Sequence, residues 1–267
     1  MRYKQRQRLY SQNFLFNRKL ITKLVSRSSI GKKDTVLEIG PGRGIITQEL
    51  LKVAAKVIAV ELDSKLYLQL KEKFKNVKNL ELVHDKFSNF KLPLYPYKVF
   101  ANMPFVITAD VIRKLTSDNN FQEGYLVVQK EAAKKFIGLP YDSKNQMLAT
   151  LLKPWFEINV CWEFNRYDFV PLPSVDTTMI RIIRVKKPVI DQNRARLYKD
   201  FVLYSYNRSK VAKLIFTQLI KQFNNFVRKA NPEQISTVTQ TARRISRQQE
   251  LIQKIHRTRA DKNWRKF

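Results

Sequence analysis

The fold of this chain depends on one stretch of sequence, Thr35-Val-Leu-Glu-Ile-Gly-Pro-Gly-Arg-Gly44. Its first half, residues 35–39, is a short apolar run typical of a buried strand, and a glycine-rich turn follows it directly. After the turn, apolar side chains such as Ile46 and Leu50 recur on one face of a predicted helix. A strand, a Gly-x-Gly-x-Gly turn and a helix bring backbone close to a ligand where a side chain would clash. The stretch therefore predicts an α/β domain with a ligand at this turn.

A second predicted strand indicates which ligand the turn binds. Residues 57–60 are apolar and end in Glu61, an acid that at this position can accept hydrogen bonds from both hydroxyls of a ribose. The dinucleotide fingerprint would place its third glycine at Ile45, whereas here the third glycine is Gly44. That spacing favours S-adenosylmethionine (SAM) over NAD. A glycine-rich turn alone is equally typical of a plain strand-to-helix connection, so the cofactor interpretation depends on Glu61.

Charge is the strongest feature of the composition. The chain has 267 residues, with 51 Lys and Arg against 22 Asp and Glu, which makes its formal net charge +29. A basic surface without a partner is the simpler explanation, but an excess this large, with 12% aromatic residues, favours a polyanionic partner. We expect nucleic acid, bound with an affinity that falls steeply with salt.

Several classes of protein are disfavoured. The longest apolar runs are far shorter than a membrane span, and the basic N-terminus leads to no secretory signal, so we expect a cytoplasmic protein that does not bind membranes. The single cysteine, Cys161, lies in an apolar context and is predicted to be a core residue. His84 and His256 are far apart in sequence, so no metal site is expected.

The order of predicted elements indicates the architecture. Strands alternate with helices over the first part of the chain, which predicts a doubly wound, mostly parallel Rossmann-like sheet. The Pro-rich link 170–174 replaces the last helix, so the final strand should be antiparallel. The strands are expected at 35–39, 57–61, 80–83, 98–101, 124–129, 158–164 and 178–183, and helices at 65–74 and 109–115.

The sequence also suggests four segments. A basic arm at 1–10 should precede a SAM-binding catalytic domain at 11–187, followed by a small helical RNA-contacting domain at 188–240 and a basic tail at 241–267. The helical domain is predicted from apolar residues at i, i+3, i+4 and i+7. These residues are Phe216, Leu219, Ile220 and Phe223.

The residues that could carry chemistry follow the third and fourth strands. Asp85 could accept a hydrogen bond from an adenine amino group, and the tetrad Asn102-Met103-Pro104-Phe105 follows directly after the next strand. An exocyclic amine of a purine is a poor nucleophile because its lone pair is delocalised into the ring. The Asn102 side chain and the Met103 carbonyl could accept its two protons and free the lone pair for attack on a methyl group, while Phe105 stacks on the base. A plain loop with a buried Phe is the alternative.

These motifs together resemble the rRNA adenine dimethyltransferase superfamily over residues 8–185. The resemblance is carried, in order, by Ser11-Gln-Asn-Phe-Leu15, Glu38-Ile-Gly-Pro-Gly-Arg-Gly44, Glu61-Leu-Asp63, Asp85, Asn102-Met-Pro-Phe105 and Phe169-Val-Pro-Leu-Pro-Ser-Val-Asp176. Within the superfamily the chain most resembles the erythromycin-resistance (Erm) methyltransferases, since the small-subunit dimethylases usually have Tyr where Phe105 stands. The Erm resemblance implies methylation of one adenine of 23S rRNA, protein-free or precursor, by an enzyme that is expected to be a monomer.

The resemblance also implies roles for individual residues. Phe105 and Phe169 would hold the target adenine from its two faces, and Asn102 belongs to both the catalytic and the cofactor site. SAM would be bound by Asn13, Leu15, Gly40, Gly42, Glu61, Asp85 and Asn102. RNA would be contacted by Arg113, Lys134 and Lys135, which could equally be ordinary solvated helix charges.

Two other functions stay open at this stage. The same chemistry could act on paired adenines near the 3′ end of small-subunit rRNA, and a non-catalytic nucleic-acid-binding factor could have kept the fold. An intact glycine turn together with Glu61, Asp85 and Asn102 argues against a pure binder, because binding alone needs none of them.

Overall fold

The computed structural model describes residues 13–138, 146–207, 216–244 and 247. The chain forms two compact units, Met1–Ile137 with Phe156–Lys186, and Gly138–Trp155 with Lys187–Phe267. Residues 146–155 thus belong with the C-terminal part of the chain, although they precede the last strands of the sheet. The domain bounds expected from the sequence stay a prediction.

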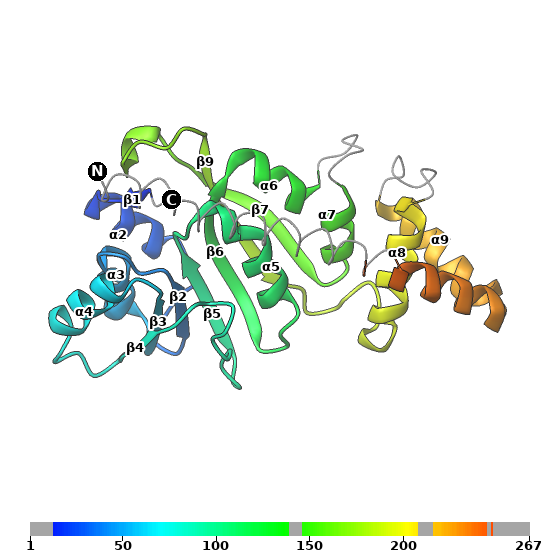
Figure 1. The fold of residues 1–267 in the computed structure, drawn as a ribbon, viewed down its shortest axis with the longest axis horizontal. Helices are drawn as coiled ribbons and strands as arrows, with labels where there is room; N and C mark the ends of the chain where they lie inside the picture. The colour runs from blue at the N-terminus through cyan, green and yellow to red at the C-terminus, as the bar shows by residue number, and fades with distance from the viewer. Residues whose placement is uncertain (1–12, 139–145, 208–215, 245–246, 248–267) are drawn as a thin grey trace, which may run out of the picture. The chain divides into compact units, whose positions relative to one another are not determined.

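A seven-stranded sheet forms the centre of the first unit (Figure 1), with strand order β4-β3-β2-β5-β6-β9-β7. The strands are β2 (Thr35–Ile39), β3 (Lys56–Glu61), β4 (Leu80–His84), β5 (Tyr97–Ala101), β6 (Phe121–Gln129), β7 (Phe156–Glu163) and β9 (Thr177–Arg184). The first five are parallel, and β9 runs antiparallel to both β6 and β7. The Rossmann-like sheet with an antiparallel final strand is therefore confirmed. The prediction that Cys161 is a core residue is wrong, because Cys161 lies on β7 at the edge of the sheet, where it is exposed.

Helices precede, connect and follow the parallel strands. They are α2 (Arg18–Ser26), α3 (Ile45–Val53), α4 (Ser64–Lys73), α5 (Thr108–Thr116) and α6 (Lys130–Ile137). Apolar residues on α2 and α3 pack on the sheet, where Leu50, Val36 and Val57 are completely buried. The central parallel strands are buried along nearly their whole length, which explains their continuous apolar runs.

A two-stranded ribbon was not expected from the sequence. β1 (Phe14–Leu15) pairs antiparallel with β8 (Phe169–Val170), so Leu15 lies opposite Phe169. Each strand has only two residues, which is too few for a periodic pattern that would predict a strand. The two strands are also far apart in the sequence, so no local signal predicts that they pair. Leu15 and Phe169 both join the main hydrophobic core, which attaches the ribbon to the sheet.

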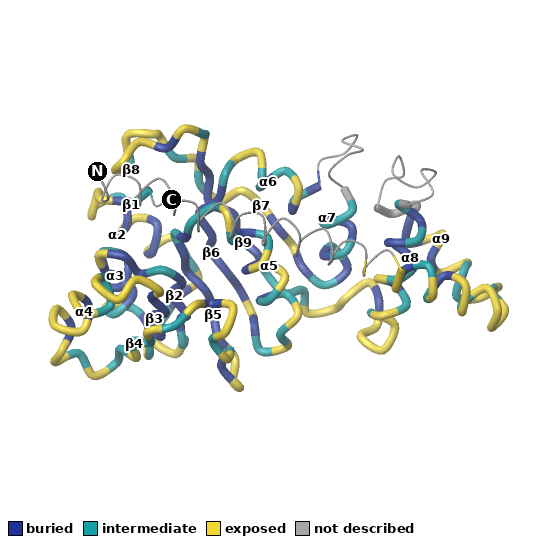
Figure 2. The backbone as a smooth tube through the Cα atoms, viewed as in Figure 1, coloured by how far each residue is buried: buried dark blue, intermediate teal, exposed yellow. Residues whose placement is uncertain are grey.

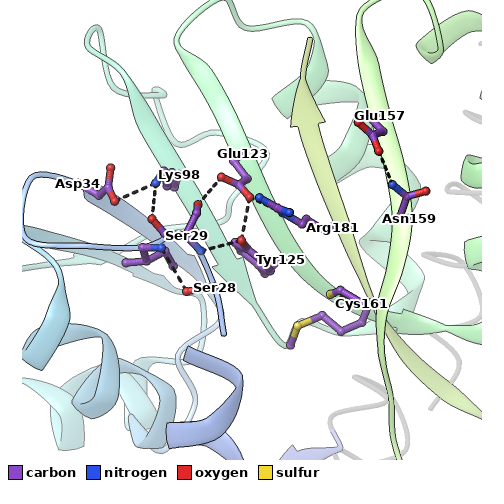
Figure 3. Close-up of polar contacts among 12 residues, drawn as sticks. Ser28, Ser29, Asp34, Lys98, Glu123, Tyr125, Glu157, Asn159, Cys161 and Arg181 are labelled. Atoms are coloured by element: carbon purple, nitrogen blue, oxygen red, sulfur yellow. Dashed lines mark hydrogen bonds and ion pairs between the residues drawn. The ribbon is translucent and has the colours of Figure 1, made fainter. Parts of the chain in front are cut away.

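Glu123 on β6 anchors the segment after α2 to the sheet (Figure 3). Its carboxylate accepts hydrogen bonds from the Ser29 hydroxyl, from the Tyr125 hydroxyl at 2.7 Å and from Arg181 Nε at 2.5 Å. The Ser29 N–H also donates to the Tyr125 hydroxyl at 2.8 Å. Burial by itself would raise the pKa of Glu123, but these hydrogen bonds hold it below its usual value. The network therefore joins the segment after α2 to β6 and β9 near neutral pH.

Replacing Glu123 with Ala should destabilise the first unit by about 3 kcal/mol, because it leaves the Arg181 and Tyr125 donors without their acceptor. The matched control is Glu157→Ala on β7, where an exposed carboxylate accepts one bond from Asn159 at 2.7 Å. That change should alter stability by less than about 0.5 kcal/mol. Thermal unfolding of both variants measures the difference. Equal shifts in Tm would mean that the network contributes no more than a surface contact.

The second unit is helical and has its own core. It contains α7 (Gln146–Leu152), α8 (Ala195–Asn207), α9 (Phe216–Lys229) and a helix over residues 232–244. Tyr198 is completely buried, donates to the Thr150 carbonyl at 2.9 Å and packs edge-on against Phe223 with the ring centres 5.2 Å apart. Of the predicted apolar face, Leu219 and Ile220 are buried here along with Phe223.

Parts of the sequence-based organisation lie outside the described residues. These parts are the arm at 1–10, most of the tail at 241–267, and the Phe216 side chain. Across the described helices, none is both long and apolar enough to cross a membrane. Figure 2 shows that dark blue, buried backbone runs along the central strands, while the loop around β8 is largely exposed.

Candidate active site

Four of the predicted cofactor residues lie at the ends of four neighbouring parallel strands. β4, β3, β2 and β5 lie side by side, and the chain leaves them through Asp85, Glu61, the turn at Gly40 and Asn102, respectively. The carboxyl ends of parallel strands meet at one edge of a sheet, where α/β proteins bind their ligands. The sheet order therefore brings these four positions to the same edge.

Glu61 holds the glycine-rich turn in shape. Its carboxylate accepts the Gly42 N–H at 3.0 Å through Oε2 and the Asp63 N–H at 2.9 Å through Oε1. Glu61 is almost completely buried, and burial raises its pKa although these backbone donors oppose the shift. The sequence predicts that Glu61 binds the ribose, but it does not predict that Glu61 also binds the backbone of the turn. Each carboxylate oxygen keeps a further lone pair, so the arrangement remains compatible with the expected ribose contact.

The three turn glycines all have positive φ, but their surroundings differ. A Cβ added at Gly40 would meet no atom within 4 Å, so this position faces open space. A Cβ at Gly42 would come within 2.7 Å of the Phe14 ring, and one at Gly44 within 2.6 Å of Leu70. Gly42 and Gly44 are therefore required by packing, whereas the open space at Gly40 leaves room for a ligand.

Replacing Gly40 with Ala should lower SAM affinity about tenfold or more, with a stability loss of only about 1 kcal/mol from the left-handed backbone. Gly44→Ala is the matched control. Gly44 has a φ of 74°, close to the 70° of Gly40, but a Cβ at Gly44 would collide with Leu70. The Gly44→Ala variant should therefore lose more stability than Gly40→Ala. Calorimetric titration with SAM and thermal unfolding separate the two effects. Unchanged SAM affinity in Gly40→Ala would place the cofactor elsewhere.

Asn102 is oriented by the N-terminal segment. Its Nδ2 donates to the backbone carbonyl of Asn13 at 2.9 Å. A carbonyl oxygen can only accept, so the amide nitrogen must face Asn13 and Oδ1 must face the other way. No hydrogen bond to Oδ1 is present among the described residues. Asn13 thus acts through its backbone, and Asn102 is left with a free acceptor.

A small pocket lies at this edge of the sheet. Three of the predicted cofactor residues, Leu15, Gly40 and Asn102, line it. Phe14 and Arg43 line it as well, with the Arg43 guanidinium 5.6 Å from the centre of the Phe14 ring. Sequence reasoning did not select these two, although both lie inside its motifs. Glu61 and Asp85 are not part of the pocket lining.

The other predicted catalytic residues occupy different environments. Met103 is buried, Pro104 and Phe105 are partly buried, and Phe105 begins the short helix η1 (Phe105–Ile107) that leads into α5. Phe169 is only 1% exposed and packs edge-on against Phe164, with the ring centres 5.2 Å apart. In this structure Phe169 is a core residue, so contact with a base would require it to become exposed.

Asp85 and the predicted RNA-binding residues also have local partners. Asp85 accepts the Lys86 N–H at 2.6 Å, so its carboxylate is held at the strand end. Arg113 pairs with Asp110 at 2.8 Å and Lys134 with Glu131 at 2.5 Å, both three residues earlier on the same helix. Lys135 is exposed. Exposed pairs of this kind contribute about 0–1 kcal/mol, so they do not prevent contact with phosphates.

Glu38 was not selected from the sequence as a site residue, yet it is the most unusual group at this edge. It lies two residues before Gly40, is 1% exposed, and neither of its carboxylate oxygens has a hydrogen-bond partner within the described part of the chain. Burial raises the pKa of Glu38 to about 8. The open space at Gly40 and the carboxylate of Glu61 at the same edge suit a cofactor with a ribose, such as SAM. The residues present therefore fit SAM.

Comparison with known proteins agrees with this geometry. The family model described as ribosomal RNA adenine dimethylase matches residues 3–256. The chain belongs to this family. It is a SAM-dependent enzyme that methylates adenine in ribosomal RNA.

Individual relatives of two kinds are similar to the chain. An rRNA adenine N-6-methyltransferase of Lysinibacillus sphaericus is 32% identical over 86% of this chain and 90% of the relative. A ribosomal RNA small subunit methyltransferase A of Mycoplasmopsis synoviae is 36% identical over 80% of this chain and 82% of the relative.

Two solved structures share the fold. A dimethyladenosine transferase from Plasmodium falciparum has a TM-score of 0.66 at 27% identity, covering 73% of this chain and 71% of that one. The 23S rRNA methyltransferase ErmE has a TM-score of 0.69 at 23% identity, covering 79% of this chain and all of that one.

Proposed function

We propose that this enzyme methylates N6 of a specific adenine in the peptidyl-transferase loop of 23S rRNA and confers resistance to macrolide, lincosamide and streptogramin B antibiotics. The observation that carries the proposal is Phe105 in the tetrad, where the Erm-like pattern departs from the Tyr usual in small-subunit enzymes. Relatives named rRNA adenine N-6-methyltransferase that align over most of this chain support it. We expect a monomer that acts on protein-free or precursor 23S rRNA.

In the proposed reaction the protein prepares the amine. The free Oδ1 of Asn102 and the Met103 carbonyl accept hydrogen bonds from the exocyclic amine of adenine, which localises the nitrogen lone pair. Pro104 fixes the backbone between these acceptors and Phe105. Phe105 stacks on one face of the base, which must leave its own stack to reach the site. When bound, SAM supplies an activated methyl group whose bond to sulfur breaks as the new C–N bond forms.

The second candidate is methylation of adenines near the 3′ end of small-subunit rRNA. The observation that favours it is the relative from Mycoplasmopsis synoviae, which is named for the small subunit and is 36% identical to this chain. The residues that hold the amine would be the same in both cases, because the chemistry at nitrogen is the same. The two candidates differ only in the RNA that surrounds the target base.

The test is transfer of labelled methyl from SAM to purified, protein-free 23S and 16S rRNA, followed by primer extension across each product. A single stop in the peptidyl-transferase loop of 23S rRNA, with macrolide resistance in a susceptible host, is the expected result. Stops near the 3′ end of 16S rRNA would overturn the proposal in favour of the small subunit. The Asn102→Ala variant serves as the inactive control on both RNAs.

A further inference from the structure

A row of cations along α2 has no assigned role. Lys19, Lys23 and Arg27 are spaced four residues apart, so they follow one face of the helix and its C-cap, and all three are exposed. Among the described residues, no carboxylate forms an ion pair with any of them. Arg113 and Lys134, by contrast, each have an acidic partner within their own helix.

Two cations of this row contact a tryptophan on the edge strand β7. Lys23 Nζ lies 5.1 Å and Arg27 Cζ 5.4 Å from the centre of the Trp162 ring, within the range of cation–π contacts. Trp162 itself packs against the main core. The ring therefore places two exposed like charges side by side, where a bound anion would relieve their mutual repulsion.

Two exposed aromatic rings lie at the end of the β1–β8 ribbon that leads into α2. Phe16, directly before the N-cap of α2, is 51% exposed, and Tyr167 is 76% exposed. The β1–β8 register, with Leu15 opposite Phe169, makes Phe16 and Tyr167 leave the ribbon at the same end. Water-exposed aromatic rings next to unpaired cations are the combination that binds unpaired nucleotides, by stacking and by phosphate contact.

The position of this surface links it to the reaction. Phe16 follows Leu15, which lines the pocket together with Asn102, and the Asn13 carbonyl holds the Asn102 amide. Unpaired nucleotides next to a target adenine at Asn102 would reach the ribbon first and α2 next. The surface is therefore continuous with the site where the base is modified.

We propose that Phe16, Lys19, Lys23, Arg27 and Tyr167 form a docking surface for the unpaired RNA strand that adjoins the target adenine. Phe16 and Tyr167 stack on its bases, and the three cations contact its phosphates. The proposal rests on the activity on ribosomal RNA and not on which subunit is modified. It is tested on whichever rRNA accepts methyl groups, so its failure is distinguishable from failure of the 23S assignment.

The charge test uses a triple variant, Lys19→Gln, Lys23→Gln and Arg27→Gln. Its control removes three exposed lysines around α4, by Lys65→Gln, Lys71→Gln and Lys78→Gln. The α2 variant should bind the substrate RNA about tenfold or more weakly, and the slope of log affinity against log salt should fall by about two, as expected for three lost contacts to a single strand. Equal losses in the two variants would overturn the proposal, because the effect would then reflect net charge alone.

The stacking test compares Phe16→Ala with Phe16→Tyr, and adds Tyr167→Ala as a second position. Each Ala variant should raise KM for RNA about tenfold while kcat and SAM affinity stay unchanged, and Phe16→Tyr should retain the wild-type KM because it keeps an aromatic face. Unchanged KM in both Ala variants would overturn the stacking contact. Loss of SAM affinity together with KM would show that the ribbon supports only the pocket, which also overturns it.

Discussion

Replacing Asn102 with Ala should reduce methyl transfer by about a thousandfold or more while leaving RNA binding nearly intact. The side chain has two separate tasks, since Nδ2 donates to the Asn13 carbonyl and Oδ1 is left to accept from the substrate amine. Alanine removes the acceptor that localises the nitrogen lone pair, and loss of one such oriented group typically lowers kcat by about 10²–10³. Loss of the contact to Asn13 would also loosen the pocket wall and add to the effect.

The control for this variant is Asn120→Ala. Asn120 is also partly buried, and its Nδ2 donates to the Pro93 carbonyl at 3.3 Å, so the same kind of bond is lost away from the strand ends that form the site. It should lose about 1 kcal/mol of stability and retain its activity. Single-turnover methylation with saturating SAM and RNA measures the chemical step in both. If Asn102→Ala retained activity within tenfold of wild type, another group would have to hold the amine.

Glu38 should make the free protein less stable as pH rises from about 5 to 8. Its folded pKa is raised to about 8 from 4.5, so between these values the unfolded chain is ionised while the folded chain holds the proton. The unfolded state is then favoured progressively, by up to about 1.4 kcal/mol per pH unit. Below pH 4.5 the carboxyl is neutral in both states and the penalty disappears. Glu38→Gln should therefore flatten this slope and be more stable than wild type at pH 8.

Glu49 provides a control of opposite sign. It is also buried but accepts bonds from Arg18, Thr22 and Lys52, which hold its pKa below the usual value against the effect of burial. Its contribution is present above pH 4.5 and is lost as pH falls through the lowered folded pKa. Glu49→Gln should therefore destabilise the protein at neutral pH. Unfolding free energies measured from pH 5 to 9 separate the effects of the two variants. If the free energy of unfolding of Glu38→Gln fell with pH as steeply as that of the wild type, burial of Glu38 would not be the cause of the pH dependence.

Local sequence signals determined the elements of the catalytic unit. The run 35–39, the glycine turn and the strand ending in Glu61 each appear in the structure where the sequence predicts them, because period, apolar content and glycine are properties of neighbouring residues. The tetrad 102–105 was found in the same way, since its chemistry is contained in four consecutive residues. Family, cofactor and reaction followed from these short motifs.

Only the tertiary structure decided the contacts that join distant segments. The Asn102–Asn13 bond spans 89 residues, the ribbon pairs Leu15 with Phe169, and α7 packs with α8. Whether an aromatic is buried, like Phe169, or exposed, like Phe16, also depends on what packs over it. Such contacts arise when elements that are distant in the sequence pack together, so no pattern of neighbouring residues predicts them. The sequence by itself thus determined which chemical groups this enzyme possesses, and the packing decided which of them are oriented, buried without a partner or free to meet RNA.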